Sequence, residues 1–176
     1  DRDSMTMGAV HEPPLLQRHR LTADEYQRLG RAQVLAPDAR VELIDGEVID
    51  MAPIGTRHWA VVSRLQRLLH DAVGHRAVIA TQLSLRLGTH SEPQPDLALF
   101  KPRDDFYIGA LPQADGAILL IEVADTIARY DREIKLPLYA RQGVVEFWIV
   151  DLEANLLRMY RRPSGERYAE VSETAT

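Results

Sequence analysis

Two acidic residues lie in stretches of sequence that otherwise have the character of buried β-strands. Asp96 lies in the run 92–100 and Glu122 in the run 117–124, and both runs are apolar for much of their length and bounded by Pro, Gly or Asp. An ionised carboxylate in a protein core is strongly destabilising unless a partner compensates its charge. Two such residues on neighbouring strands therefore predict a shared cation.

The chemistry that suits two carboxylates and a divalent cation is phosphodiester hydrolysis. Carboxylate oxygens are hard ligands and favour Mg²⁺ or Mn²⁺ over zinc. Such an ion polarises a phosphoryl oxygen and makes a water molecule more acidic, while a nearby ammonium group orients that water or offsets developing charge. In this sequence the combination is provided by Asp96, Glu122 and Lys135.

Lysine is rare in this chain, which makes each lysine informative. Of the 21 basic residues, only Lys101 and Lys135 are lysines. A compact ammonium kept in an arginine-rich chain indicates a role that the bulkier guanidinium, which cannot act as a base, would fill poorly. The alternative is that both lysines are chance occurrences.

The dipeptide Asp45-Gly46 predicts a β-hairpin, because it favours a two-residue turn between apolar strands. The segments 40–44 and 47–51 would then pair so that Glu42 and Glu47 lie on the same face. Either both glutamates are ordinary solvent-exposed residues, or one of them turns toward the acidic pair and becomes a third acidic ligand.

Two helices are predicted around this hairpin, and each is ended by a glycine. Thr22 and Glu25 form a capping box for a short helix over 22–29. A longer amphipathic helix covers 56–73, with its first residue as the cap. His58, near its start, is either a polar cap residue or a group that faces the site. The inner face of the longer helix is expected to carry Val61, Val62, Leu65, Leu68, Leu69 and Val73.

The remaining elements complete an α/β pattern. We expect a long strand over 77–87, then the two acidic strands, a helix over 127–142, and a closing pair of strands over 144–151 and 156–161. Pro137 predicts a bend or a helix start near Lys135. This order is typical of a mixed β-sheet flanked by helices, with the hairpin on its N-terminal side.

The length of 176 residues fits one domain. We expect a tail over residues 1–20, a folded domain over 21–162, and a loose C-terminal tail over 163–176. The first of these could also be an expression remnant, because the segment shows no clear periodicity.

The composition excludes several classes of protein and site. There is no cysteine, so disulfides and thiolate zinc sites are excluded, and we expect a cytoplasmic protein. No uncharged apolar stretch approaches the roughly 18 residues that span a bilayer, so no membrane association is expected. The net charge of -5 argues against a protein that coats nucleic acid, but not against a nuclease with an acidic metal site. No motif for a serine nucleophile or a bound nucleotide is present, and no organic cofactor is expected.

A series of motifs follows the acidic residues along the chain. They are Glu42-Leu-Ile-Asp-Gly-Glu47, Glu92-Pro-Gln-Pro-Asp-Leu97, Ile121-Glu-Val123, Tyr130-Asp-Arg-Glu-Ile-Lys135 with Tyr139-Ala-Arg141, and Glu146-Phe-Trp-Ile-Val-Asp151. With them the chain resembles the PD-(D/E)XK nuclease superfamily and, within it, the Uma-two group of restriction-endonuclease-like proteins. The resemblance covers about residues 21–162 and implies a restriction-endonuclease-like α/β fold.

One position departs from the superfamily pattern. The motif has a lysine two residues after the glutamate, where this chain has Ala124. The resemblance implies that Lys135, from the following helix, supplies the ammonium instead.

Our leading hypothesis is a metal-dependent endonuclease that hydrolyses DNA. Asp96 and Glu122 would bind Mg²⁺ or Mn²⁺, and Lys135 would position the water. Glu42 or Glu47 would complete the acidic shell, and His58 would line the cleft. An alternative is a catalytically silent nuclease fold that binds DNA or protein. We also expect a homodimer. In a third possibility, Glu122 simply pairs with an arginine in the core.

Overall fold

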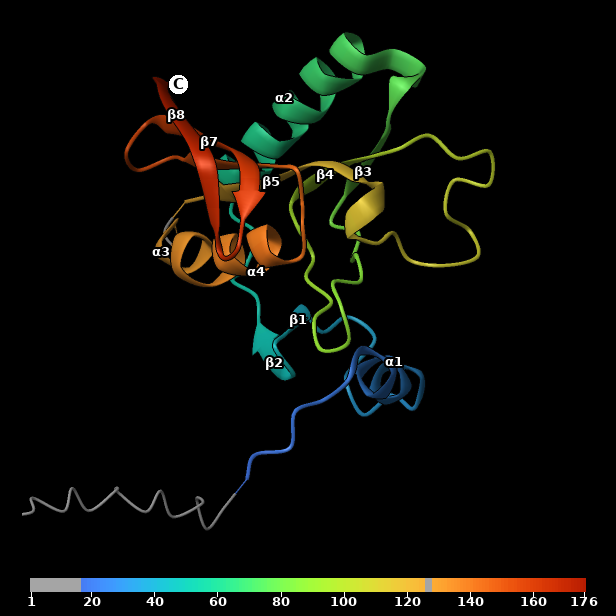
Figure 1. Ribbon diagram of the computed structural model, residues 1–176. Helices are drawn as coiled ribbons and strands as arrows, with labels where there is room; N and C mark the ends of the chain where they lie inside the picture. Colours follow the sequence, from blue (N-terminus) through green and yellow to red (C-terminus); the bar gives the residue numbers. More distant parts are fainter. Residues whose placement is uncertain (1–16, 126–127) are drawn as a thin grey trace, which may run out of the picture.

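The computed structural model describes residues 17–125 and 128–176, and within them a six-stranded sheet forms the centre of the molecule (Figure 1). The strand order is β3-β4-β5-β6-β7-β8; β5 and β6 run parallel, and all other neighbours are antiparallel. This mixed sheet confirms the expected α/β class. The strands are β3 (Val78–Thr81), β4 (Leu97–Phe100), β5 (Ala117–Ala124), β6 (Glu146–Asp151), β7 (Leu156–Ser164) and β8 (Arg167–Ala175).

Helices cover both faces of this sheet (Figure 1). The long helix α2 (Thr56–Val73) packs on one face, where Val62 contributes to an apolar cluster with strand residues such as Leu97. The short helix α4 (Leu136–Arg141) packs on the other face, where the Tyr139 ring meets the Phe147 ring edge-on at 4.8 Å between centroids. Because β4 and β5 are buried on both faces, their sequences are nearly continuous apolar runs.

The predicted hairpin is confirmed as a small separate sheet of β1 (Val41–Ile44) and β2 (Glu47–Asp50). Its register pairs Glu42 with Ile49, as the two-residue turn requires. Gly46 has a positive φ of 82°, and a Cβ atom added there would lie 2.9 Å from the Arg20 Cα atom. Both the turn and the neighbouring backbone therefore require glycine at this position.

The first helix, α1 (Ala23–Arg31), has the predicted capping box between Thr22 and Glu25, although it continues one residue beyond its glycine. The predicted cap of α2 was wrong: Thr56 is the first helical residue, and the preceding glycine occupies the N-cap without a side-chain hydrogen bond. On the predicted inner face of α2, Leu68 is 56% exposed and does not belong to the core.

The long strand predicted over 77–87 was also wrong, because β3 ends at Thr81. Gln82 follows with a positive φ of 51°, a conformation that interrupts an extended strand. Leu85 and Leu87 are nevertheless buried in the core, which explains the alternating pattern in the sequence.

Residues 163–176 do not form the loose tail that we expected. They complete β7 and form β8, which pairs with β7 along its length at the edge of the sheet. Most side chains of β8 are exposed, so its sequence lacks an apolar alternation, and Tyr168 is its one buried side chain. Of the expected N-terminal tail, residues 1–16 lie outside the described residues.

The predicted helix over 127–142 consists of three consecutive pieces. They are α3 (Ala128–Tyr130), the π-helical segment η3 (Asp131–Lys135) and α4, with position 127 outside the described residues. Pro137 lies in the first turn of α4, directly after the π-helical segment. This arrangement confirms the irregularity expected near Lys135.

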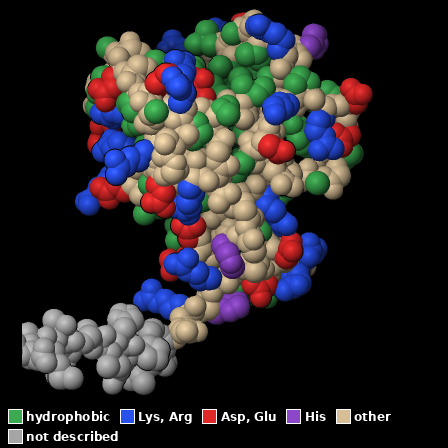
Figure 2. All heavy atoms as spheres, in the orientation of Figure 1, with side chains coloured by type: hydrophobic (Ala, Val, Ile, Leu, Met, Phe, Trp, Pro, Cys, Tyr) green, Lys and Arg blue, Asp and Glu red, His purple; other side chains and the backbone are tan. Residues whose placement is uncertain are grey.

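The surface carries charges of both signs close together, as the space-filling view shows for one face (Figure 2). Among the described residues, none of the helices is long and apolar enough to span a lipid bilayer.

The contribution of β8 to stability can be tested at its one buried side chain. The Tyr168 hydroxyl donates a hydrogen bond of 2.8 Å to the Val144 carbonyl, and its ring packs near Tyr160. Tyr168→Ala should lower the free energy of unfolding by about 3–5 kcal/mol, because it removes a buried aromatic ring. In urea unfolding, the control Val171→Ala, an exposed position of β8, should cost less than about 1 kcal/mol. Equal small effects would contradict a folded β8.

Candidate active site

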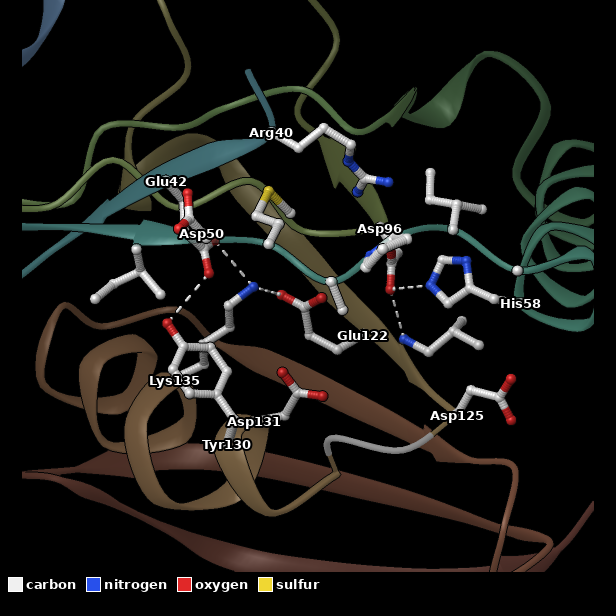
Figure 3. Close-up of a pocket in the computed structure, with 17 residues that line it drawn as sticks. Arg40, Glu42, Asp50, His58, Asp96, Glu122, Asp125, Tyr130, Asp131 and Lys135 are labelled. Carbon is white, nitrogen blue, oxygen red and sulfur yellow. Dashed lines mark hydrogen bonds and ion pairs between the residues drawn. The ribbon is translucent and has the colours of Figure 1, made fainter. Parts of the chain in front are cut away.

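A cavity of about 650 Å³ opens between the hairpin, the start of α2, the ends of β4 and β5, and the segment that contains η3 (Figure 3). Five of the six residues predicted from the sequence line this cavity: Glu42, His58, Asp96, Glu122 and Lys135. The sixth, Glu47, does not. Its side chain is exposed and lies 3.9 Å from the Arg18 guanidinium.

Lys135, the last residue of η3, carries a buried ammonium at the inner end of the cavity. Its Nζ atom lies 2.8 Å from Glu122 Oε1 and 3.1 Å from Glu42 Oε2. Burial alone would lower the pKa of Lys135, but the negative charges of Glu122, Glu42 and Asp131 outweigh burial and raise the pKa. The ammonium therefore stays protonated.

Glu122 projects from β5 toward this ammonium. Its Oε1 atom accepts hydrogen bonds from Lys135 Nζ and, at 2.9 Å, from the Tyr139 hydroxyl. Burial raises the pKa of the Glu122 carboxyl, and the charge of Lys135 opposes that rise. The possibility that Glu122 pairs with a core arginine is therefore wrong, since its cationic partner is a lysine.

Glu42 holds the same ammonium from the hairpin side. Its Oε2 atom also accepts a hydrogen bond of 3.1 Å from the backbone N–H of Gln94, and its Oε1 atom accepts one of 3.2 Å from the Tyr130 hydroxyl. Both oxygens of this buried carboxylate are thus engaged by the protein. The geometry suits Glu42 to orienting the Lys135 ammonium rather than to binding a metal ion.

Asp96 lies directly before β4, and its Oδ2 atom has two partners. It accepts a hydrogen bond of 2.8 Å from the backbone N–H of Val123, which anchors it beside Glu122. The Nε2 atom of His58 lies 3.0 Å away, and this hydrogen bond raises the pKa of His58 although burial opposes it. His58 makes no capping hydrogen bond and faces the cavity.

Sequence reasoning missed Asp131, which is 3% exposed and faces the same cavity (Figure 3). No described residue forms a hydrogen bond or ion pair with its carboxylate. Burial raises its pKa from 3.8 to about 6, with contributions from the charges of Asp96 and Glu42 and opposition from Lys135. The available signal was its spacing, because a residue four positions before Lys135 shares a helical face with it.

The donor set fits a hydrated hard cation. Among the described residues, no three His, Asp or Glu side chains form a ready-made cation cage. On each of the two predicted ligands, one oxygen nevertheless accepts no hydrogen bond from any described residue: Asp96 Oδ1 and Glu122 Oε2. Mg²⁺ commonly keeps several waters and takes only one or two carboxylates from the protein. These two residues would hold such an ion.

The sequence model of the Uma2 family, described as "Putative restriction endonuclease", matches residues 23–175. The chain belongs to the Uma2 family. This match extends to β8, beyond the C-terminal limit of the domain expected from the sequence. No curated protein matches the sequence significantly.

A solved structure supports the fold of this Uma2 family member. It is a crystal structure described as a "putative nuclease belonging to DUF820", from Anabaena variabilis. The two chains share 18% sequence identity, with a TM-score of 0.69 over 89% of this chain and 85% of the other. At this identity the likeness shows a common fold, the restriction-endonuclease-like mixed sheet expected from the sequence.

The buried ammonium should be important for stability, and the chain offers a matched control in its second lysine. Lys135→Met leaves two buried carboxylates without their cation, so it should lower the free energy of unfolding by about 3–5 kcal/mol. Lys101→Met changes an exposed lysine and should stay within about 0.5 kcal/mol of wild type. Denaturant unfolding compares the two variants. Similar values for both would mean that the Lys135 ion pairs contribute nothing net.

Asp131 should show the opposite behaviour, because its charge is buried without a partner among the described residues. Its folded pKa lies above its ordinary value, so its contribution to stability falls as pH rises from about 4 to 6 and is most unfavourable above pH 6. Asp131→Asn should therefore raise the free energy of unfolding at pH 8 by about 1–3 kcal/mol. The gain should shrink at pH 5. A variant that is less stable than wild type at pH 8 would contradict this account.

Proposed function

We propose that this protein is a metal-dependent endonuclease that hydrolyses phosphodiester bonds in DNA. One observation carries the proposal: Asp96 and Glu122 present uncommitted carboxylate oxygens to one cavity, and a buried, protonated lysine lies beside them. Two carboxylates and an ammonium are the groups that metal-assisted phosphodiester hydrolysis requires.

Each residue of the site has a distinct role in this proposal. Asp96 and Glu122 would hold Mg²⁺ or Mn²⁺, which when bound neutralises charge on a phosphoryl oxygen and makes a water molecule more acidic. Lys135 would orient the attacking water and offset charge that develops on the phosphoryl group, and Glu42 keeps its ammonium in place. His58 would fix the orientation of Asp96 through their hydrogen bond.

The family relationship supports the substrate. The Uma2 family carries the description "Putative restriction endonuclease", and its model covers nearly all of the described chain, including every residue of the site. The fold shared with the structure described as a "putative nuclease" is consistent with this. We further propose that the protein acts as a homodimer in the cytoplasm, and light scattering in solution tests the dimer.

A second candidate function is a catalytically silent nuclease fold that binds DNA or a protein partner. It is favoured by Ala124 at the position of the motif lysine and by the engagement of the Lys135 ammonium with two carboxylates. Calorimetric titration with Mn²⁺ separates the two functions. Binding that Asp96→Asn abolishes supports the enzyme, and an absence of binding to the folded wild type supports the silent module.

Cleavage of supercoiled plasmid DNA in the presence of Mg²⁺ or Mn²⁺ tests the enzyme directly. Asp96→Asn removes a charged ligand and should lower the cleavage rate on the order of 100-fold or more, with an unchanged fold by circular dichroism. The control Asp125→Asn changes an acid at the cavity edge that pairs with Arg57, and its rate should stay within about threefold of wild type. Full activity in Asp96→Asn would rule out the proposed site.

A further inference from the structure

Arg40 is the second cationic residue on the cavity wall, and its position is fixed by the hairpin. It directly precedes β1, and its backbone carbonyl accepts a hydrogen bond of 2.8 Å from the N–H of Met51, which follows β2. The residue thus continues the pairing of the two strands. Its side chain is half-buried and lines the cavity.

The guanidinium of Arg40 has no hydrogen bond or ion pair with any described residue. This distinguishes it from the other cations around the site. The Lys135 ammonium contacts two carboxylates, and Arg57 contacts Asp125 and the Leu152 carbonyl. Internal acids therefore occupy those two cations, whereas Arg40 keeps its donors available for a ligand.

The close-up view shows where this free group points. The guanidinium of Arg40 extends into the cavity from the hairpin wall and lies on the side of Asp96 and His58, away from Lys135 (Figure 3). Its positive charge acts to lower the pKa of His58, against the larger raising effect of Asp96, which agrees with the proximity of Arg40 and His58. Arg40 thus faces the outer part of the cavity, beside the proposed cation ligand Asp96.

The cavity wall around Arg40 is strongly acidic. Six carboxylates line the wall, from Glu42, Asp50, Asp96, Glu122, Asp125 and Asp131. Among the described lining residues, Arg40 and Lys135 carry the permanent positive charges, and Arg57, outside the lining, pairs with Asp125. Lys135 lies at the inner end of the cavity between two carboxylates, so the contact that first holds a phosphodiester falls to a cation whose donors no described residue engages. A guanidinium matches two phosphate oxygens with two parallel hydrogen bonds.

We propose that Arg40 binds the non-bridging oxygens of a DNA phosphodiester in this cavity. The phosphate would then lie between the guanidinium and the pair formed by Asp96 and Glu122. This inference rests on the proposed function and deepens it, because it assigns the contact that holds the substrate. Arg40 binds the substrate in this assignment, whereas Lys135 acts at the reacting water.

Equilibrium binding of a fluorescein-labelled DNA duplex tests the assignment in the non-cleaving Asp96→Asn background. Adding Arg40→Gln should weaken binding about tenfold or more and reduce the slope of log affinity against log salt by about one phosphate contact. Arg40→Lys keeps the charge but not the paired hydrogen bonds, so it should give an intermediate affinity and an almost unchanged slope. The control Arg167→Gln changes an exposed arginine on β8 and should bind like the background.

The outcomes separate the two proposals. Wild-type protein that does not cleave plasmid DNA overturns the endonuclease function. Wild-type protein that cleaves DNA, together with Arg40→Gln and Arg40→Lys variants that bind with the background affinity and salt slope, overturns the role of Arg40 alone. Calorimetric titration with inorganic phosphate adds a readout independent of DNA and of cleavage. Phosphate should bind more weakly to Arg40→Gln than to Arg167→Gln, and equal binding contradicts the assignment.

Discussion

A single buried ammonium connects three parts of this molecule that are distant in sequence. Lys135 comes from the helical segment after β5, Glu122 from β5 of the six-stranded sheet, and Glu42 from the separate hairpin. Each carboxylate alone would be costly to bury, and the ammonium alone would be costly as well. Together they stabilise one another, and their ion pairs join the hairpin, β5 and the helical segment at the inner end of the cavity. Asp96 and His58 are positioned separately, by the backbone N–H of Val123 and by α2.

The same compensation explains why the chain uses lysine at this position. A compact ammonium can lie between two carboxylates while the Tyr139 hydroxyl contacts one of the same oxygens. The planar guanidinium is larger and presents its donors in a fixed fork. The two cations of the cavity lining differ accordingly: the Lys135 ammonium lies between acids, and the Arg40 guanidinium extends into the cavity.

Local chemistry made much of the fold predictable. The Asp-Gly turn, the capping box and the apolar runs of β4 and β5 each act over a few residues, and each was found where the sequence placed it. β8 was missed because an edge strand exposed on most of its length needs no apolar alternation. The end of β3 was missed because the positive φ of Gln82, which ends the strand, has no signal in the residue types around it.

For the site, the sequence could identify residues but not their relative positions. An acidic residue within an apolar strand can be recognised from the sequence alone, and so can a rare lysine. Asp96, Glu122 and Lys135 were therefore identified as site residues. The hairpin register gives Glu42 and Glu47 the same face, and only the tertiary placement decides that Glu42 lies over the cavity. Asp131 and Arg40 were missed because acidic residues are common in helices and arginines are common in this chain. Only the structure shows that these two side chains have no hydrogen bond or ion pair with a described residue.

The π-helical segment η3 has a consequence for how this site can change in evolution. Its wide turn contains more residues than an α-helical turn over the same axial distance. Loss of one residue there would restore ordinary α-helical winding and leave the flanking turns close to their present orientation, because the wide turn accommodates one additional residue. Such a deletion should thus preserve the helix while removing the wide turn that carries Asp131 and Lys135, so the constraint falls on the length of η3 as well as on residue identity.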